Sequence, residues 1–249
     1  MSDLSWPFIL SIAATFLLAG LVKGVTGMGL PTVAMGLLGA IMSPVAAAAL
    51  LIVPSFVTNV WQLFSGPSFS ALFRRLWPMM ACIVLGTVAG SSILAHGETR
   101  WTTAGLGAAL IVYAGFTLLS RQLRVPLRLE PWLSPAIGLT TGLVTGGTGV
   151  FVIPAVPYLQ ALGLGKDDLI QALGLSFTIS TVALAIGLAW RGAFQLDGLA
   201  LSSLAIAPAL LGMGLGQAVR QRVSQAAFRR GFLICLLLLG TELSLRPFL

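Results

Sequence analysis

Two short segments of the chain combine glycine and threonine in a pattern that suits anion binding. Residues 21–31 read LVKGVTGMGLP, and the related sequence LVTGGTGVFVI follows 122 residues later, at 143–153. Each segment interrupts a long apolar stretch, and we expect a helix to restart just after each glycine run. A helix N-terminus attracts anions because its first backbone N–H groups are unpaired and its dipole is positive there.

The candidate substrate-binding residues are those around the two expected restarts. Glycine lets the backbone adopt positive φ and approach a ligand closely, while a threonine hydroxyl caps a helix or donates a hydrogen bond to the ligand. The candidates are Gly24, Thr26, Gly27 and Met28 in the first segment, and Gly146, Gly147, Thr148, Gly149 and Val150 in the second. Two such N-termini that face each other would bind a small oxyanion with almost no full positive charge.

Lys23 is the one basic residue embedded in an apolar stretch of the sequence. An isolated charge at the centre of a bilayer costs about 2.5–3.5 kcal/mol, so this lysine either pairs with the anion or extends toward an aqueous surface. Polar residues also recur in the apolar runs that follow the glycine segments, at 55–62 and 171–181. They either form hydrogen bonds between helices or line the anion site. The candidates among them are Ser55, Asn59 and Ser176.

The composition places these segments in a membrane. Hydrophobic residues make up 57% of the 249 residues and charged residues only 8%, with a mean hydropathy of +0.99, whereas a soluble domain carries about 25% charged residues. The net charge of +7 comes from basic residues in short loops, which the positive-inside rule explains. The expected fold class is therefore an all-α polytopic membrane protein that contacts the lipid bilayer and no nucleic acid.

The sequence lacks catalytic and metal-binding motifs. His96 is its only histidine, Cys82 and Cys235 lie in apolar runs, and no C-x-x-C, H-E-x-x-H or G-x-S-x-G motif occurs. The segment GLGKD at 163–167 lacks the first glycine and the Ser or Thr of a phosphate-binding loop. We therefore expect no enzyme activity, no cofactor and no metal site, and an energy source in a gradient or a partner.

The apolar runs divide the chain into two halves. Runs of spanning length, about 20 residues, lie near 44–64, 76–95, 101–119, 168–189, 198–218 and 229–246. The stretches 6–42 and 133–165 each hold two apolar arms that meet at a glycine segment, as in a helical hairpin or a broken helix. We predict a first transmembrane repeat at 1–119, a basic cytoplasmic linker at 120–132 and a second transmembrane repeat at 133–249. Four further glycines have a spacing typical of close helix packing: Gly86, Gly90, Gly212 and Gly216.

Within each repeat, the hairpin returns to the side of the membrane from which it enters, and the three spans cross the membrane three times. The second repeat therefore begins on the opposite side and is expected to be inverted relative to the first. One side of the membrane then collects ten basic residues and the other three, with Lys23 left out at a hairpin tip. The ten are Arg74, Arg75, Arg121, Arg124, Arg128, Lys166, Arg220, Arg222, Arg229 and Arg230, and the three are Arg100, Arg191 and Arg246. The positive-inside rule places the ten in the cytoplasm and both termini in the periplasm. The alternative, eight continuous spans in parallel repeats, divides the basic residues seven to six.

Three motifs resemble the TauE/SafE family, also called the sulfite exporter family. They are KGVTGMGLP near the start, GGTGVFVIP after the basic linker, and GMGLGQAVRQRVSQAAFRRGFLICLLLLGTEL at 212–243. The resemblance covers nearly the whole chain. It implies transport of a small sulfur-containing anion, such as sulfite, thiosulfate or an organosulfonate, across a bacterial inner membrane. The family is often described as having eight spans, which differs from the hairpin topology predicted here.

The expected function is secondary transport, in the direction of export, of a small sulfur-containing oxyanion bound at mid-membrane between two opposed helix N-termini. The alternatives are an anion channel, and a membrane enzyme or assembly factor that handles a sulfur metabolite. The expected partners are the small anionic substrate and the lipid bilayer, and a homodimer is compatible with the sequence. The expected location is the bacterial inner membrane, as a multi-pass protein with periplasmic termini.

Overall fold

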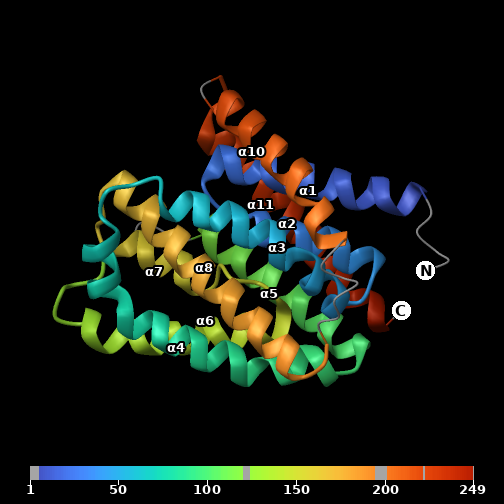
Figure 1. Cartoon of the computed structure of the whole chain (residues 1–249), viewed down its shortest axis with the longest axis horizontal. Coiled ribbons are helices and arrows are strands. Elements are labelled where there is room, and N and C mark those ends of the chain that lie inside the picture. The colour runs from blue at the N-terminus through green and yellow to red at the C-terminus, as the bar shows by residue number, and fades with distance from the viewer. Residues whose placement is uncertain (1–5, 120–123, 194–200, 221, 249) are drawn as a thin grey trace.

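The computed structural model of the protein describes residues 6–119, 124–193, 201–220 and 222–248, and these residues form helices and no strands (Figure 1). The fold is all-α, as the composition predicts. The helices before the linker are α1 (Trp6–Thr26), α2 (Leu30–Ile41), α3 (Pro44–Leu63), α4 (Phe69–His96) and α5 (Thr99–Leu119). The helices after it are α6 (Glu130–Thr148), α7 (Ala155–Ala161), α8 (Lys166–Trp190), α10 (Ile206–Arg220) and α11 (Gln225–Leu245), followed by a short 3-10 helix at Arg246–Phe248.

Seven helices in the described part of the chain are long and apolar enough to cross a bilayer. Six of them cover the runs of spanning length found in the sequence, although residues 198–200 of one run lie outside the described residues. The seventh is α1, whose 21 residues extend over about 31 Å. This length lets α1 cross the membrane by itself rather than reach only its middle. The chain is therefore a multi-pass membrane protein.

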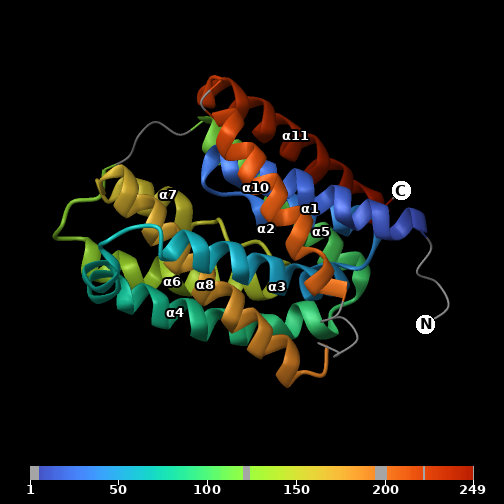
Figure 2. The same ribbon diagram turned by 45° about the horizontal axis from the view of Figure 1, so that its top comes forward.

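The first glycine segment forms the tip of a helical hairpin. α1 ends at Thr26, Gly27 and Gly29 have φ angles of 78° and 101°, and α2 turns back beside α1 (Figures 1 and 2). Glycine adopts these left-handed angles without the steric penalty that other residues meet. The expected helix restart near Met28 is confirmed to within two residues, because α2 begins at Leu30.

The second glycine segment also ends a helix, but the chain continues differently. α6 ends at Thr148, Gly149 has a φ angle of 72°, and residues 150–154 are not helical. The expected helix restart near Val150 is therefore wrong, since α7 begins only at Ala155. Pro154 accounts for the delay, because proline disfavours helical backbone at the residue before it and is itself well placed at a helix start.

Helices of the two halves pack against one another. α1 packs against α10 and α6 against α4, while α3 packs against α8 and α5 against α11. Glycines bring the first two pairs close together, as their spacing predicts. A Cβ added to Gly86 would lie 3.0 Å from the Cα of Gly142, and one added to Gly216 would lie 2.9 Å from the Cα of Gly24. The two halves therefore share one core.

The residues in contact give the relative direction of each helix pair. Gly20 of α1 meets Ala209 of α10 and Gly24 meets Met213, so α1 and α10 run parallel. The residues in contact show in the same way that α4 and α6 run parallel. The pairs α3–α8 and α5–α11 run antiparallel. The first turn of α1 and the last turn of α11 lie on the same side of the molecule in both views (Figures 1 and 2).

Candidate functional site

Lys23 lies in the last turn of α1 and is buried, with 3% of the residue exposed. Its Nζ donates hydrogen bonds to Oγ1 of Thr58, at 3.2 Å, and to Oδ1 of Asn59. Both partners are neutral side chains of α3, and no carboxylate in the described part of the chain forms an ion pair with Lys23. The lysine amine is therefore held by hydrogen bonds and not by an opposite charge.

Asn59 connects Lys23 to the second half of the chain. Its Nδ2 donates to Oγ1 of Thr181 on α8 at 3.2 Å, and Thr181 donates in turn to the carbonyl of Phe177 at 2.7 Å. Because the hydroxyl proton of Thr181 is used on the backbone, its oxygen accepts from the Asn59 amide. This fixes Oδ1 of Asn59 as the acceptor that faces the lysine. Asn59 and Thr181 are 122 residues apart, which is also the separation of the two glycine segments.

The hydroxyls of Thr26 and Thr148 hold the two tips in the same way. Thr26 donates to the carbonyl of Val22 at 2.8 Å and accepts from the N–H of Met28 at 3.3 Å. Thr148 makes the matching pair of hydrogen bonds in the second tip, at 2.7 and 3.2 Å. The expected capping of the restarting helices is wrong, because the N-caps of α2 and α7 are Gly29 and Pro154 and the two hydroxyls bond to backbone at the end of the preceding helix.

Gln62 of α3 fixes the first tip from outside the glycine segment. Its Nε2 donates to the carbonyl of Gly27 at 2.9 Å and to the carbonyl of Ile170 on α8 at 3.0 Å. Its Oε1 is buried and has no hydrogen-bond partner among the described residues. The sequence showed Gln62 only as one polar residue of an apolar run, and the contact with the tip arises from the packing of α1 against α3 and α8.

Two adjoining cavities of about 530 and 420 Å³ lie beside the first tip. Gly27, Ile170, Lys166 and Arg220 line both, and the exposed Lys166 shows that they reach the surface of the protein. The larger cavity also contains Lys23 and Gln62, and the smaller one contains Thr26, Met28 and Arg229. Four basic residues and no acidic ones thus line the two cavities in the described part of the chain: Lys23, Lys166, Arg220 and Arg229.

Three of these four basic residues were not predicted as site residues from the sequence. Lys166, Arg220 and Arg229 were counted only as loop charges that set the orientation in the membrane. The signal that points to Arg220 is the glycine spacing. Because Gly216 packs against Gly24, the residue one turn after Gly216 lies near the end of α1, where Lys23 is.

Gly24 and Gly146 lie inside helices rather than at the turns. A Cβ added to Gly24 would lie 2.9 Å from the backbone nitrogen of Gln217 on α10, and one added to Gly146 would lie 2.6 Å from that of Ser91 on α4. Close helix packing therefore accounts for both glycines, although Gly24 also borders the larger cavity.

The second tip is closely packed. A Cβ added to Gly149 would lie 2.7 Å from Cε of Met35 on α2, and Val150 is fully buried. Gly147 faces Ile93, whose nearest atoms would lie 3.9 Å from an added Cβ. None of the five candidates in this tip lines the two cavities at the first tip. Within the described residues, the structure does not bring two helix N-termini together around one cavity, contrary to the arrangement expected from the sequence.

The remaining candidates, Ser55 and Ser176, are buried away from both cavities. Neither hydroxyl has a hydrogen-bond partner among the described residues.

The part of the chain that the structure describes contains no group of three His, Cys, Asp or Glu side chains that could hold a metal ion, and both cysteines are free.

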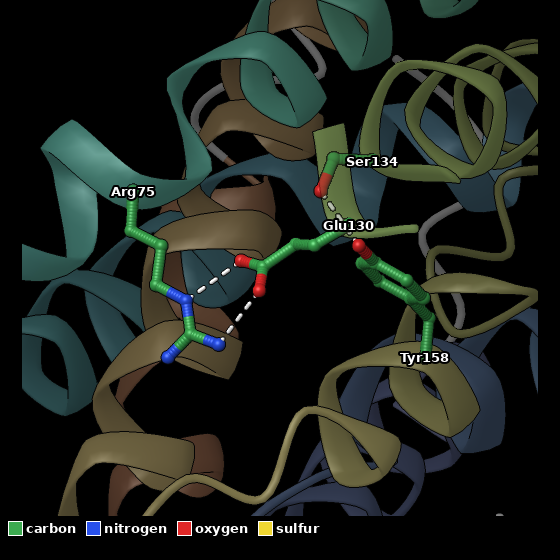
Figure 3. A network of polar contacts seen from close by, with 4 residues as sticks. All are labelled: Arg75, Glu130, Ser134 and Tyr158. Atoms are coloured by element: carbon green, nitrogen blue, oxygen red, sulfur yellow. Dashed lines mark hydrogen bonds and ion pairs between the residues drawn. The ribbon is translucent and has the colours of Figure 1, made fainter. Parts of the chain in front are cut away.

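An ion pair fixes the start of the second hairpin. Arg75 of α4 binds Glu130, the first residue of α6, through two N–O contacts of 2.6 and 2.8 Å (Figure 3). Beside it, Ser134 of α6 and Tyr158 of α7 share a hydrogen bond of 2.6 Å (Figure 3). A two-pronged arginine–carboxylate contact fixes orientation as well as charge. These contacts hold α6 and α7 in place next to α4, and no sequence pattern predicted them.

A comparison with models of known protein families assigns the chain to one of them. The family model described as sulfite exporter TauE/SafE matches residues 12–243. The chain belongs to the TauE/SafE family. This confirms the resemblance carried by the three motifs, and the matched range includes every residue that lines the two cavities. The comparisons with curated proteins and with solved structures give no match.

The TauE/SafE family is a family of sulfite exporters, which are membrane transporters and not enzymes. The match begins within α1 and ends within α11, so it includes both glycine segments of this TauE/SafE protein.

Proposed function

We propose that this TauE/SafE protein is a secondary transporter that exports a small sulfur-containing oxyanion, and that the anion binds beside Lys23 at the first tip. The observation that carries the proposal is the cavity lined by Lys23, Lys166 and Arg220, to which the described residues contribute no carboxylate. Sulfite, thiosulfate or a sulfonate would supply the missing negative charge, and lysine and arginine donate strong, charge-assisted hydrogen bonds to such oxygens.

The packing of the helices supports two inverted repeats. α1 packs parallel to α10 of the second half, and α6, its counterpart, packs parallel to α4 of the first. The pairs α3–α8 and α5–α11 join counterparts in antiparallel fashion. A twofold axis in the membrane plane would relate the halves in this way, as in other transporters with inverted repeats.

The difference between the two tips supports a carrier over a channel. The first tip borders a cavity, whereas Gly149 of the second tip is packed against Met35. A carrier exposes its site to one side at a time, and its substrate shifts the population between two such conformations. In the opposite conformation the second tip would open, and its candidate residues, Gly147 to Val150, would contact the anion.

The distribution of charge supports an orientation in the bacterial inner membrane. Lys166, Arg220 and Arg229 border the cavities and belong to the more basic side of the protein, which the positive-inside rule assigns to the cytoplasm. The site would then load from the cytoplasm, as export requires, and both termini would lie in the periplasm.

Uptake by proteoliposomes tests the proposal. Sulfite, thiosulfate, sulfate and ethanesulfonate are compared as substrates of the purified protein, and we expect saturable uptake and exchange of at least one of them. Lys23→Met should weaken binding of that anion about 10- to 100-fold, because a hydrogen bond to a charged group contributes about 1.5–3 kcal/mol.

The control for this test is Arg128→Met, which removes an exposed charge that lies outside both cavities. It should bind the anion like the wild type. Equal transport by Lys23→Met and the wild type would show that the anion binds elsewhere. Conductance without saturation or exchange would identify a channel.

A further inference from the structure

The nitrogen of Lys23 has one more bonding position than its two partners occupy. A neutral lysine amine has two N–H groups and a lone pair, whereas a protonated amine has three N–H groups. Asn59 accepts one N–H through Oδ1. Thr58 accepts another, since its own hydroxyl proton is donated to the carbonyl of Pro54 at 2.8 Å. The third position therefore carries either a lone pair or an N–H, depending on the protonation state.

The groups around Lys23 offer no acceptor charge for this third position. α10 contributes Arg220, α8 contributes Lys166, α11 contributes Arg229 and α5 contributes Tyr113 to the two cavities. α2 and α3 contain no titratable side chain. Two acids, Asp167 and Asp168, follow Lys166 in the first turn of α8, and neither lines a cavity or pairs with Lys23. Since a buried charge without a partner is unstable, the protonated amine requires an anion, and the neutral amine does not.

We propose that Lys23 is a proton-binding site that is coupled to the anion, so that the amine takes up one proton when the anion binds and releases it when the anion leaves. This inference rests on the proposed function, because the anion must enter the cavity beside Lys23. Without the anion, both N–H groups of the neutral amine are bonded to Thr58 and Asn59. With the anion, the third N–H donates to one of its oxygens.

Proton uptake and release by Lys23 need no reactant other than water. The lone pair of the Lys23 nitrogen accepts a proton from water on the side where the anion enters, and no bond of the anion is made or broken. The proton returns to water on the side where the anion is released. One proton then accompanies each monovalent anion, so the transport cycle is electrically neutral, and net export is driven by a higher concentration of the anion in the cytoplasm and not by the pH difference.

Coupling of this kind is reciprocal, because each ligand changes the affinity for the other by the same factor. Where the empty protein holds a neutral amine, the affinity for the anion falls about tenfold for each unit by which the pH rises, since one unit corresponds to about 1.36 kcal/mol. The affinity becomes independent of pH where the empty protein is already protonated.

Proton uptake on anion binding tests the inference directly. The purified full chain is placed in detergent with a pH indicator and little buffer, over a series of pH values, and ethanesulfonate is added. This anion of a strong acid takes up no protons itself. We expect about one proton per anion bound at the higher pH values, decreasing to zero at the lower ones.

Two variants test whether Lys23 is the group that takes up the proton. Lys23→Arg should bind ethanesulfonate without proton uptake, because a guanidinium stays protonated in proteins. Lys166→Met, which removes another lysine of the same cavity, should bind more weakly but still take up about one proton per anion. Proton uptake that persists in Lys23→Arg would overturn the assignment to Lys23.

The wild-type protein decides the question even if a variant does not fold. In proteoliposomes, a pH difference of one unit should accumulate ethanesulfonate about tenfold on the alkaline side. Binding without proton uptake at any pH, or no accumulation, would overturn the coupling and leave the proposed function intact. If ethanesulfonate, sulfite and thiosulfate all fail to bind, the proposed function is wrong, and the inference is wrong with it.

Discussion

Gly24 and Gly27 lie three residues apart in one segment, yet alanine at the two positions is expected to act through different mechanisms. Gly24 is inside α1, where it packs against α10. Gly27 is at the turn, with a φ angle of 78°, and an added Cβ would have no atom within 4 Å. The first substitution therefore acts on helix packing, and the second acts on the backbone of the turn and on the space in the cavity.

The free-energy cost of each substitution follows from these contacts. A Cβ at position 24 would lie 2.9 Å from the Cα of Gly216 and from the backbone nitrogen of Gln217, and closer still to the carbonyl oxygen of Met213. Because all three are backbone atoms, no side-chain rotation relieves the overlap, and α1 and α10 must separate. Overpacking costs about 1–3 kcal/mol, and overlap with rigid backbone lies at the upper end of that range. Gly27→Ala costs only the left-handed backbone penalty, about 1–2 kcal/mol.

Thermal unfolding in detergent and anion binding measure the two effects separately. We expect Gly24→Ala to lower Tm more than Gly27→Ala does. Gly27→Ala should lower Tm by only a few degrees but weaken anion binding, because its methyl group enters the cavity. Gly214→Ala is the control, since Gly214 is an exposed glycine of α10 with no atom within 4 Å of an added Cβ. An equal loss of Tm in Gly24→Ala and Gly214→Ala would refute the close contact between α1 and α10.

Three further predictions concern the tips, the orientation and the ion pair. Thr26→Val and Thr148→Val each remove one matching set of tip hydrogen bonds and should lower stability by similar amounts, about 1 kcal/mol; clearly unequal losses of Tm would contradict the equivalence of the tips. Reporter fusions within 124–129 and after residue 249 should show a cytoplasmic linker and a periplasmic C-terminus, and a cytoplasmic C-terminus would contradict the inverted arrangement. Arg75→Gln and Glu130→Gln should each lower Tm, and the double variant should lower it by less than the sum of the two, as is typical of residues in direct contact; additive losses would mean that the ion pair contributes nothing.

The sequence predicted the helical class and most of the spanning helices because these depend on local properties. Apolar runs of about 20 residues favour helices in a bilayer whatever their neighbours are. The two turns were also predictable, because Gly27 and Gly149 occupy left-handed angles that glycine adopts readily. The late start of α7 was missed, although Pro154 is visible in the sequence, since the expectation followed the first segment, where Pro31 lies only two residues after Gly29.

The candidate site was predicted only in part. Lys23, Gly27 and Asn59 were named from the sequence, and the structure brings them together. Arg220 and Gln62 reach the same place through contacts between helices that are far apart in the chain. A sequence pattern records which face of a helix is polar, but it does not record which other helix covers that face.

The sequence by itself determined that this protein is a helical membrane protein of the TauE/SafE family with two glycine-tipped turns, because composition, hydrophobic length and glycine placement act within a few residues. Only the tertiary structure decided that the first tip borders a basic cavity while the second is packed against Met35. Only the tertiary structure decided, too, that neutral side chains hold Lys23. The physical reason is that burial and charge pairing at a site are set by side chains from several helices, and their distances are fixed only when the helices pack.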